Sequence, residues 1–283
     1  ACLVGSEMCI RDRISTTSDK TDLLSISHAS RSATIGITIT DNATLAQYNT
    51  AKAATDSAVQ VTGALRDSLA NLTDSSNALE TAAQNLVSGD TNVNIELTDD
   101  PASSSDALEQ LNAVAGATGH LGTITATVEA SASDINTKLG NLGTGDPITF
   151  TVTGTSDWTA LQSVDTKTSL STIDVAAITD TYDNIILMTA DADFDHANAT
   201  LTIKSDQTTS KAEYDALDLL TTGTVGFSRI SDNYSNLKAM GDNGLLNGKV
   251  VTATGQLTVA QLDQLQTYSA TSIAYNITDN TTN

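Results

Sequence analysis

The chain is poor in the residues that usually build disulfide-stapled domains or deep globular cores. Its 283 residues include 2 cysteines, 2 prolines, 1 tryptophan, 3 phenylalanines and 6 tyrosines. Both cysteines, Cys2 and Cys9, fall within the first thirteen residues, so residues 14–283 can form neither disulfides nor thiolate metal sites. With so few aromatic side chains, a thin core of Val, Ile, Leu and Ala is expected, which favours a repetitive fold.

Basic residues are also scarce. Lys and Arg total 13 against 34 Asp and Glu, a formal net charge of −21. Nucleic acids and anionic membranes bind to basic surfaces, so the charge excludes both as partners. No apolar stretch approaches the length of a transmembrane helix, and we expect no membrane insertion.

Residues 1–13 share no pattern with the rest of the chain. The ten residues Leu3–Asp12 resemble a translated sequencing-library adapter. No apolar run in this stretch is long enough for a signal peptide, so we expect residues 1–13 to be a disordered, adapter-derived artefact. Their removal takes away two basic and two acidic residues and leaves the net charge at −21.

A compound unit recurs along residues 35–283. It consists of an alternating apolar/polar run that ends in Asp, Ser or Gly, a helix-like stretch with apolar residues three apart, and a second extended segment. The first runs are 37–41, 95–99, 150–154, 201–205 and 251–255. The helix-like stretches are 45–55, 108–118, 161–171, 214–223 and 262–271. The second extended segments are 58–63, 123–128, 172–178, 224–230 and 272–277.

These units predict the domain organisation. Residues 14–34 are expected to be the tail of a preceding repeat, and the chain is expected to be cut at both ends. The predicted repeats are 35–91, 92–147, 148–199, 200–248 and a truncated fifth at 249–283. The second repeat is divergent, because Asp134 and Ile135 occupy the end of the Asp…Asn motif described below but the capping aspartate at its start is missing.

The strand pattern selects the architecture. Strands joined through helices run parallel, and their crossovers are right-handed. Alternation such as I-T-I-T and F-T-V-T leaves one polar face on each strand, whereas a doubly covered sheet has continuous apolar strands. We therefore expect a right-handed α/β solenoid similar in outline to leucine-rich repeats, with a single parallel sheet and helices on one face. A coiled coil over Asp67–Val87 is the weaker alternative, since heptads are lacking elsewhere.

An Asp followed four residues later by Asn recurs after the second extended segment. The pairs are Asp67 and Asn71, Asp180 and Asn184, and Asp232 and Asn236, with Asp279 and Asn283 at the same spacing. Each aspartate stands where the next helix needs an N-cap and is expected to accept hydrogen bonds from its first-turn amides. Each asparagine either forms a ladder with the neighbouring coil, as in leucine-rich repeats, or is a tolerated polar residue on an exposed turn.

One segment has the spacing of a metal site. Asp191, Asp193 and Asp195 alternate as calcium-loop ligands do, although His196 and Thr202 occupy positions where an EF-hand has Gly and Glu. The alternative is a solvated acidic loop. Calcium is the one cofactor that the sequence suggests.

No catalytic constellation stands out. The histidines, His28, His120 and His196, are far apart and form no zinc motif. There is no nucleophile elbow, phosphate loop or calcium nonapeptide repeat. Trp158 is expected to be a local packing residue. We therefore expect a protein that is not an enzyme.

The pattern ITDxATLAQYNTxxAAT…VTxxxxDSxANL resembles tandem repeats of very large secreted or cell-surface proteins of aquatic bacteria. The segments that carry it are Ile39–Thr55, Asp67–Leu72, Ile178–Ile185, Ile230–Leu237 and Leu257–Asp279. The resemblance implies an extracellular or cell-surface scaffold, often found beside calcium-binding modules and type I secretion, with no enzymatic residues.

Two functions remain open on the sequence. The first is a structural or adhesive repeat segment of a large surface protein, whose partners are neighbouring repeats and an extracellular protein or glycan. The second is a calcium-dependent carbohydrate- or protein-binding module in which Asp191, Asp193 and Asp195 hold the ion.

Overall fold

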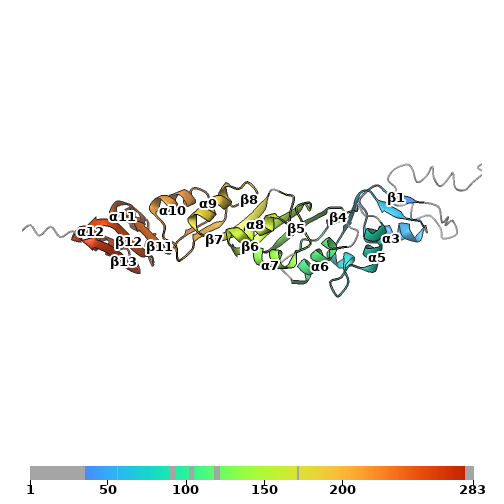
Figure 1. Cartoon of the computed structure of the whole chain (residues 1–283), viewed down its shortest axis with the longest axis horizontal. Helices are drawn as coiled ribbons and strands as arrows, with labels where there is room; N and C mark the ends of the chain where they lie inside the picture. The colour runs from blue at the N-terminus through green and yellow to red at the C-terminus, as the bar shows by residue number, and fades with distance from the viewer. Residues whose placement is uncertain are drawn as a thin grey trace, which may run out of the picture. The chain divides into compact units, whose positions relative to one another are not determined.

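The computed structural model describes residues 36–277 except Asp56, 90–92, 102–104, 118–121 and Ser171 (Figure 1). The chain divides into two compact units, with boundaries after Thr151, Gln162 and Leu170. The predictions for residues 1–34, for His120, and for Asp279 and Asn283 lie outside the described residues.

The first unit contains five strands, five helices and the beginning of a sixth strand among its described residues. They are β1 (Ile37–Ile39), α3 (Leu45–Ala53), β2 (Val59–Val61), β3 (Ala64–Asp67), α4 (Leu69–Leu72), α5 (Thr81–Gly89), β4 (Asn94–Leu97), α6 (Ser105–Ala115), β5 (Ile124–Ser131) and α7 (Ala132–Lys138). The boundaries between the units fall within β6 (Ile148–Ser156) and α8 (Trp158–Asp165). Because α4 and α5 are separate short helices, the coiled-coil alternative for this part of the chain is wrong.

The described part of the second unit continues the alternation of strands and helices. Its elements are β7 (Ile173–Asp180), α9 (Tyr182–Ala190), β8 (Phe194–Asp195), β9 (Thr200–Ile203), α10 (Lys211–Asp218), β10 (Val225–Gly226), β11 (Arg229–Asp232), α11 (Tyr234–Asp242), β12 (Val250–Leu257), α12 (Val259–Gln266) and β13 (Ser272–Ile277). In both units, every predicted extended segment contains a strand and every predicted helix-like stretch overlaps a helix. The mixed α/β class is therefore confirmed.

Most of the described strands lie beside the next strand along the chain and run parallel to it; β2 and β3, β8 and β9, and β10 and β11 are the exceptions. In the first unit β1 pairs with β2, and β4 lies between β3 and β5. In the second unit β9 lies between β7 and β10, β8 pairs with β7, and β12 lies between β11 and β13. Parallel neighbours require a crossover connection, which the intervening helices and loops supply.

The prediction of a single sheet is wrong, because the described strands form a two-stranded, an eight-stranded and a three-stranded sheet. The sheets are separated where the backbone bends between two consecutive strands. Between β2 and β3 the chain leaves strand geometry at Thr62 and Gly63, and one parallel bridge, Ala43 with Leu65, continues the ladder there. A second parallel bridge, Thr209 with Ile230, does the same in the second unit.

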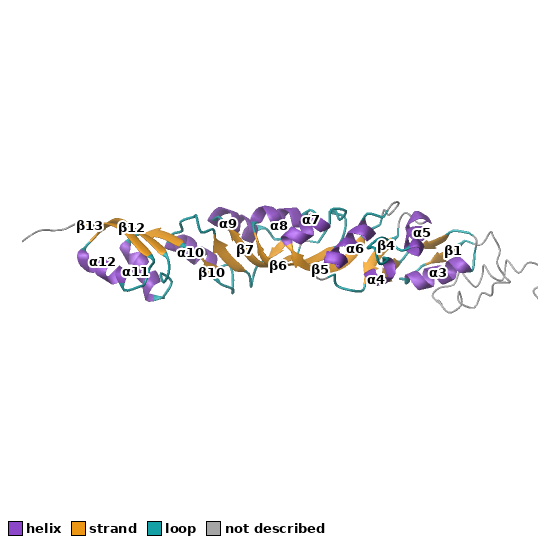
Figure 2. Ribbon diagram, turned by 90° about the horizontal axis from the view of Figure 1, so that it is seen from below, coloured by secondary structure: helices purple, strands orange, loops and turns teal. Residues whose placement is uncertain are grey.

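Each well-formed strand buries one face and exposes the other. On β5 the buried positions are Ile124, Ala126, Val128 and Ala130, while Thr125, Thr127 and Glu129 alternate with them and are exposed. β1, β2 and β4 show the same alternation. The predicted polar face is confirmed for these strands. Figure 2 shows α11 and α12 along one side of β12 and β13, where they bury Leu237, Leu262 and Leu265.

Helix starts are set by short polar side chains. Thr44, Ser210 and Thr258 each accept a hydrogen bond from the third helical amide, and the Gln or Glu at that position returns a bond to the cap backbone. This capping box satisfies donors that the first turn would otherwise leave unpaired. It fixes the residue at which each of these helices begins, and the first residues of α3 and α10 are the ones that Asp67 and Asp232 bind.

Candidate functional site

Asp67 joins two consecutive strand–helix steps. It is the last residue of β3 and is only 6% exposed. Its Oδ2 accepts the backbone N–H of Leu45, the first residue of α3, at 2.9 Å. Its Oδ1 accepts the N–H of Ser68 at 2.9 Å and the side-chain amide of Asn71 at 2.6 Å. The carboxylate thus binds the start of the preceding helix and the start of its own helix at the same time.

Asp180 repeats this arrangement at the end of β7. Its Oδ2 accepts the N–H of Trp158, the first residue of α8, at 3.0 Å, and its Oδ1 accepts the N–H of Thr181 at 2.8 Å. Asn184 donates its side-chain amide to the same carboxylate. The ammonium of Lys204 lies 3.0 Å from Oδ1 and adds an ion pair to this site.

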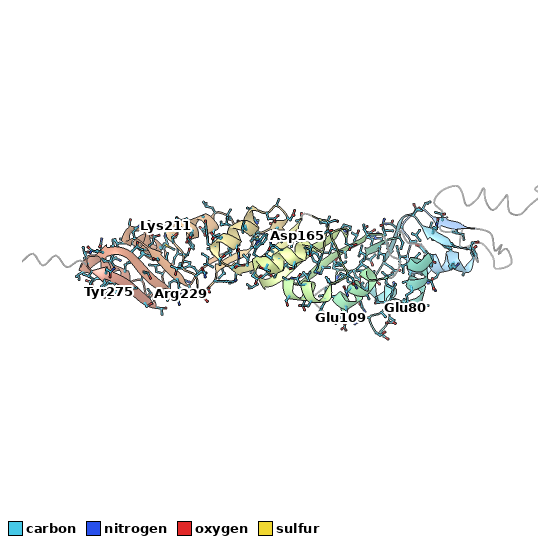
Figure 3. All side chains as sticks on the ribbon, viewed as in Figure 1. Glu80, Glu109, Asp165, Lys211, Arg229 and Tyr275 are labelled. Carbon is cyan, nitrogen blue, oxygen red and sulfur yellow. The ribbon has the colours of Figure 1, made fainter. Side chains whose placement is uncertain are left out.

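Asp232 gives a third copy at the end of β11. Its Oδ2 accepts the N–H of Lys211 at 2.9 Å, and Lys211, labelled in Figure 3, is the first residue of α10. Its Oδ1 accepts the N–H of Asn233 at 2.7 Å and the side-chain amide of Asn236 at 2.8 Å. We call each such carboxylate, with the preceding helix start that it binds, an aspartate clamp.

The electrostatics of the Asp180 clamp favour the charged form. Burial alone would raise the pKa of Asp180. Hydrogen bonds from Trp158, Lys204, Thr181 and Asn184 outweigh burial and lower the pKa from 3.8 to about 2. The clamp is therefore an ionised carboxylate at neutral pH, and a charged acceptor makes stronger hydrogen bonds than a neutral one.

The predicted capping role of these aspartates is wrong in one respect. Asp67, Asp180 and Asp232 were expected to cap the helix that follows them, but the N-cap residues of those helices are Ser68, Thr181 and Asn233. Thr181 and Asn233 accept the expected first-turn bond from their own side chains, and Ser68 makes no side-chain cap bond. The aspartates reach the preceding helix instead, because parallel pairing places its start beside the end of the next strand.

The ladder interpretation of the asparagines is wrong, and Asn71, although exposed on a first turn as the alternative expected, has a specific partner. Asn71 and Asn236 donate their side-chain amides to Asp67 and Asp232, the aspartates four residues earlier, and not to the backbone of a neighbouring step. These bonds engage Oδ1, and leave Oδ2 to the preceding helix. The asparagines thus orient the clamp rather than forming a ladder.

Two aspartates with related roles were missed on the sequence. Asp99 accepts the N–H of Leu69, the first residue of α4, at 3.0 and 3.1 Å, so the divergent second repeat also has a carboxylate at the preceding helix. Asp146 accepts the N–H groups of Ile124 and Gly143 at 2.9 and 3.0 Å. The sequence did contain a signal for Asp99, because it ends one of the alternating runs. It was missed because Ser103 occupies the position four residues later where the Asp…Asn motif has Asn.

The predicted calcium ligands are not gathered into a metal site. Asp191 accepts the N–H of Asp193 and Asp195 accepts that of Ala197, each at 3.1 Å, which are local turn bonds. Between them Phe194 is 3% exposed and belongs to β8, which pairs with β7. Asp191 and Asp193 thus belong to a turn that leads into β8, and their carboxylates do not bond to a common point. Among the described residues, no three His, Cys, Asp or Glu side chains are grouped to hold a metal ion.

The aromatic residues near this segment serve packing. The rings of Trp158 and Phe194 meet edge to face with centroids 5.4 Å apart. This geometry is a favourable one for aromatic pairs. The expectation that Trp158 is a local packing residue is confirmed, and His196 lies with its Nδ1 3.1 Å from the carbonyl oxygen of Phe194.

No known protein family, curated protein or solved structure matches this chain. None of the helices in the described part of the chain is long and apolar enough to cross a membrane.

Proposed function

We propose that the chain is a non-enzymatic structural segment of a large extracellular or cell-surface bacterial protein, in which the aspartate clamps hold consecutive strand–helix steps together. The observation that carries the proposal is the recurrence of one clamp at Asp67, Asp180 and Asp232, 21 or 22 residues after the helix start that each binds. A catalytic residue usually occurs at one position in a fold, whereas a contact that stabilises each repeat recurs in every repeat. The recurrence of the clamps therefore favours a structural role.

The finer architecture in this proposal is a right-handed α/β solenoid similar to leucine-rich repeats. It is supported by three features: parallel pairing of strands that are neighbours in the chain, helical connections between them, and strands with one buried face. Crossovers between parallel strands are right-handed in about 98% of cases. In such an array, each step contacts only its neighbours and stability is a sum of local terms.

The exposed threonine-rich faces could also serve the adhesive role suggested by the sequence, with an extracellular protein or glycan as the partner. We favour the structural role, because the clamps are repeated features of the described residues and no comparable feature marks the exposed faces as a binding site. The calcium-dependent alternative has no observation in its favour, since Asp191, Asp193 and Asp195 are not grouped around a common point.

Stretching the full chain between its termini in an optical trap tests the structural role. A structural array is expected to yield a series of partial unfolding events, because each step is fastened to its neighbours separately. Asp180→Asn is expected to lower the force of the event that releases α8 and to leave the others unchanged, and Asp174→Asn on the exposed face of β7 is the matched control. Rupture of the whole chain in one event would overturn the proposal.

A further inference from the structure

The last described strand, β13, carries apolar side chains that the described residues leave exposed. In β13, Ile273 pairs in register with Val251, and Ile277 with Leu257. Val251 and Leu257 are each 1% exposed, but Tyr275 and Ile277 are 43% and 42% exposed. Tyr275 is labelled in Figure 3. The strand therefore continues the apolar pattern of its sheet beyond the point where the described residues bury it.

The outer edge of β13 also lacks the features that prevent pairing. Its sequence, SIAYNI, contains no charged residue and no proline. Natural edge strands commonly use charges or proline to block further pairing, and the irregularity in the β12–β13 ladder places its extra residues on β12 and not on β13. Beside it, Val259 at the start of α12 is 56% exposed. In a repeat array, an end that faces water needs a polar outer surface, and this end does not have one.

From this continuity we propose that β13 and α12 form a docking surface for a further strand–helix step of the same series, with its strand parallel to β13. The interface would continue the one already present between β11, β12 and β13, where each strand is parallel to the next. The occupant is a strand with apolar residues at alternate positions, linked to a helix. The inference rests on the proposed structural role, since it requires that steps add to one another.

A second copy of the chain is the competing occupant. At the other end of the series, β1 buries Ile37 and Ile39 to 2% and 6% exposure, so its core positions are already covered. It therefore exposes less apolar core area than β13 does for head-to-tail stacking. The formal charge of −21 on each copy also opposes association.

The test extends the full chain after Asn283 with a second copy of residues 237–283. The copy begins at residue 237 because Asp279 and Asn283 have the spacing of Asp232 and Asn236, so that Leu237 follows Asn283 as it follows Asn236. The copy carries Ile273→Val so that its peptides differ in mass from the original ones. In a control extension the copy also carries Val251→Lys and Ala253→Lys, which prevent its strand from burying its inner face.

Hydrogen exchange of the original 272–277 amides is the readout, with the mass of each protein in solution measured in parallel. The proposal predicts that the matched extension slows this exchange about tenfold or more, because the edge becomes paired, and that the lysine extension leaves it unchanged. Unchanged exchange with the matched extension would overturn the proposal. Protection of these amides in a dimer of the unextended chain would overturn it in favour of a second copy. Either failure would leave the clamps and their unfolding test intact.

Discussion

At the level of single residues, a buried carboxylate is costly unless every lone pair finds a donor. Asp180 meets this requirement with two backbone amides, the Asn184 amide and the Lys204 ammonium. Its pKa is depressed, so its contribution to stability is present above the unfolded-state value near 3.8 and is lost as the pH falls through about 2. The shift corresponds to about 2 kcal/mol.

The Asp180→Asn variant is therefore expected to lose about 2 kcal/mol of unfolding free energy at neutral pH, because it removes the charged acceptor of the clamp. Urea unfolding of both proteins from pH 7 to pH 2 measures the difference. We expect it to be constant above pH 4 and to shrink as the pH approaches 2. A difference that persists undiminished at pH 2 would show that the charge of Asp180 is not its source. Asp174→Asn, which removes an exposed carboxylate from the same strand, is expected to change little.

Asn71 offers a second test, because its amide donates to the Asp67 carboxylate at 2.6 Å. Asn71→Ala should cost about 1.5 kcal/mol, the typical value for a hydrogen bond to a charged group. Asn71→Asp should cost more at pH 7, since it places a second carboxylate beside the first. Urea unfolding at pH 7 compares the two variants. Equal stability of the two variants at pH 7 would contradict the assigned contact.

At the level of elements, close backbone approach between steps depends on glycine. A Cβ on Gly223 would lie 2.3 Å from the carbonyl oxygen of Ala199, just before β9. Similar approaches occur at Gly63 and Gly122, where the nearest atoms belong to Asp41 and Val93. These positions leave no room for a Cβ, because the backbone just before each strand contacts the backbone just before the residues that pair with that strand in the preceding step.

Gly223→Ala is accordingly expected to destabilise the second unit by about 1–3 kcal/mol, the usual cost of overpacking. Gly145→Ala is the matched control, because a Cβ there meets no atom within 4 Å, and we expect a change within about 0.5 kcal/mol. Thermal or urea unfolding compares the two variants. Equal changes in unfolding free energy for the two variants would mean that the backbone at Gly223 can move away from Ala199 without loss of stability.

The elements themselves could be predicted because alternation and helical spacing are local signals. The runs that begin at Ile37, Phe150 and Val251 each became strands, and the stretch from Leu45 became α3. The helix that each aspartate binds could not be predicted, since Asp67 is adjacent in sequence to its own helix but in space to Leu45, 22 residues earlier. The division into three sheets could not be predicted, because a backbone bend such as that at Gly63 does not change the apolar/polar pattern of the sequence.

At the level of the whole molecule, the acidic composition was a misleading guide to metal binding. Asp191, Asp193 and Asp195 have ligand-like spacing, but Phe194 is buried and pairs through β8 with β7, and the three carboxylates are not grouped. Burial of a neighbouring aromatic residue is a tertiary event that the spacing of carboxylates does not report. The excess of negative charge instead acts as a diffuse repulsion, which salt screens.

Calcium is therefore expected to raise the melting temperature no more than magnesium does at the same concentration, because both ions act only by screening. Differential scanning fluorimetry in matched chloride solutions makes the comparison. A calcium-specific increase that Asp193→Asn abolishes would restore the metal-site hypothesis, since an ion that binds only the folded state must stabilise it.

The central claim is that the strand-end aspartate binds the start of the preceding helix, while at Asp180 and Asp232 the next residue caps the following helix through its side chain. Residue-resolved amide exchange in Asp180→Asn and Thr181→Ala tests this most directly, because the two residues are adjacent but bind Trp158 and Asn184 respectively. The account predicts faster exchange of the Trp158 amide in Asp180→Asn and of the Asn184 amide in Thr181→Ala. Faster exchange at Asn184 with an unchanged Trp158 amide in Asp180→Asn would contradict it.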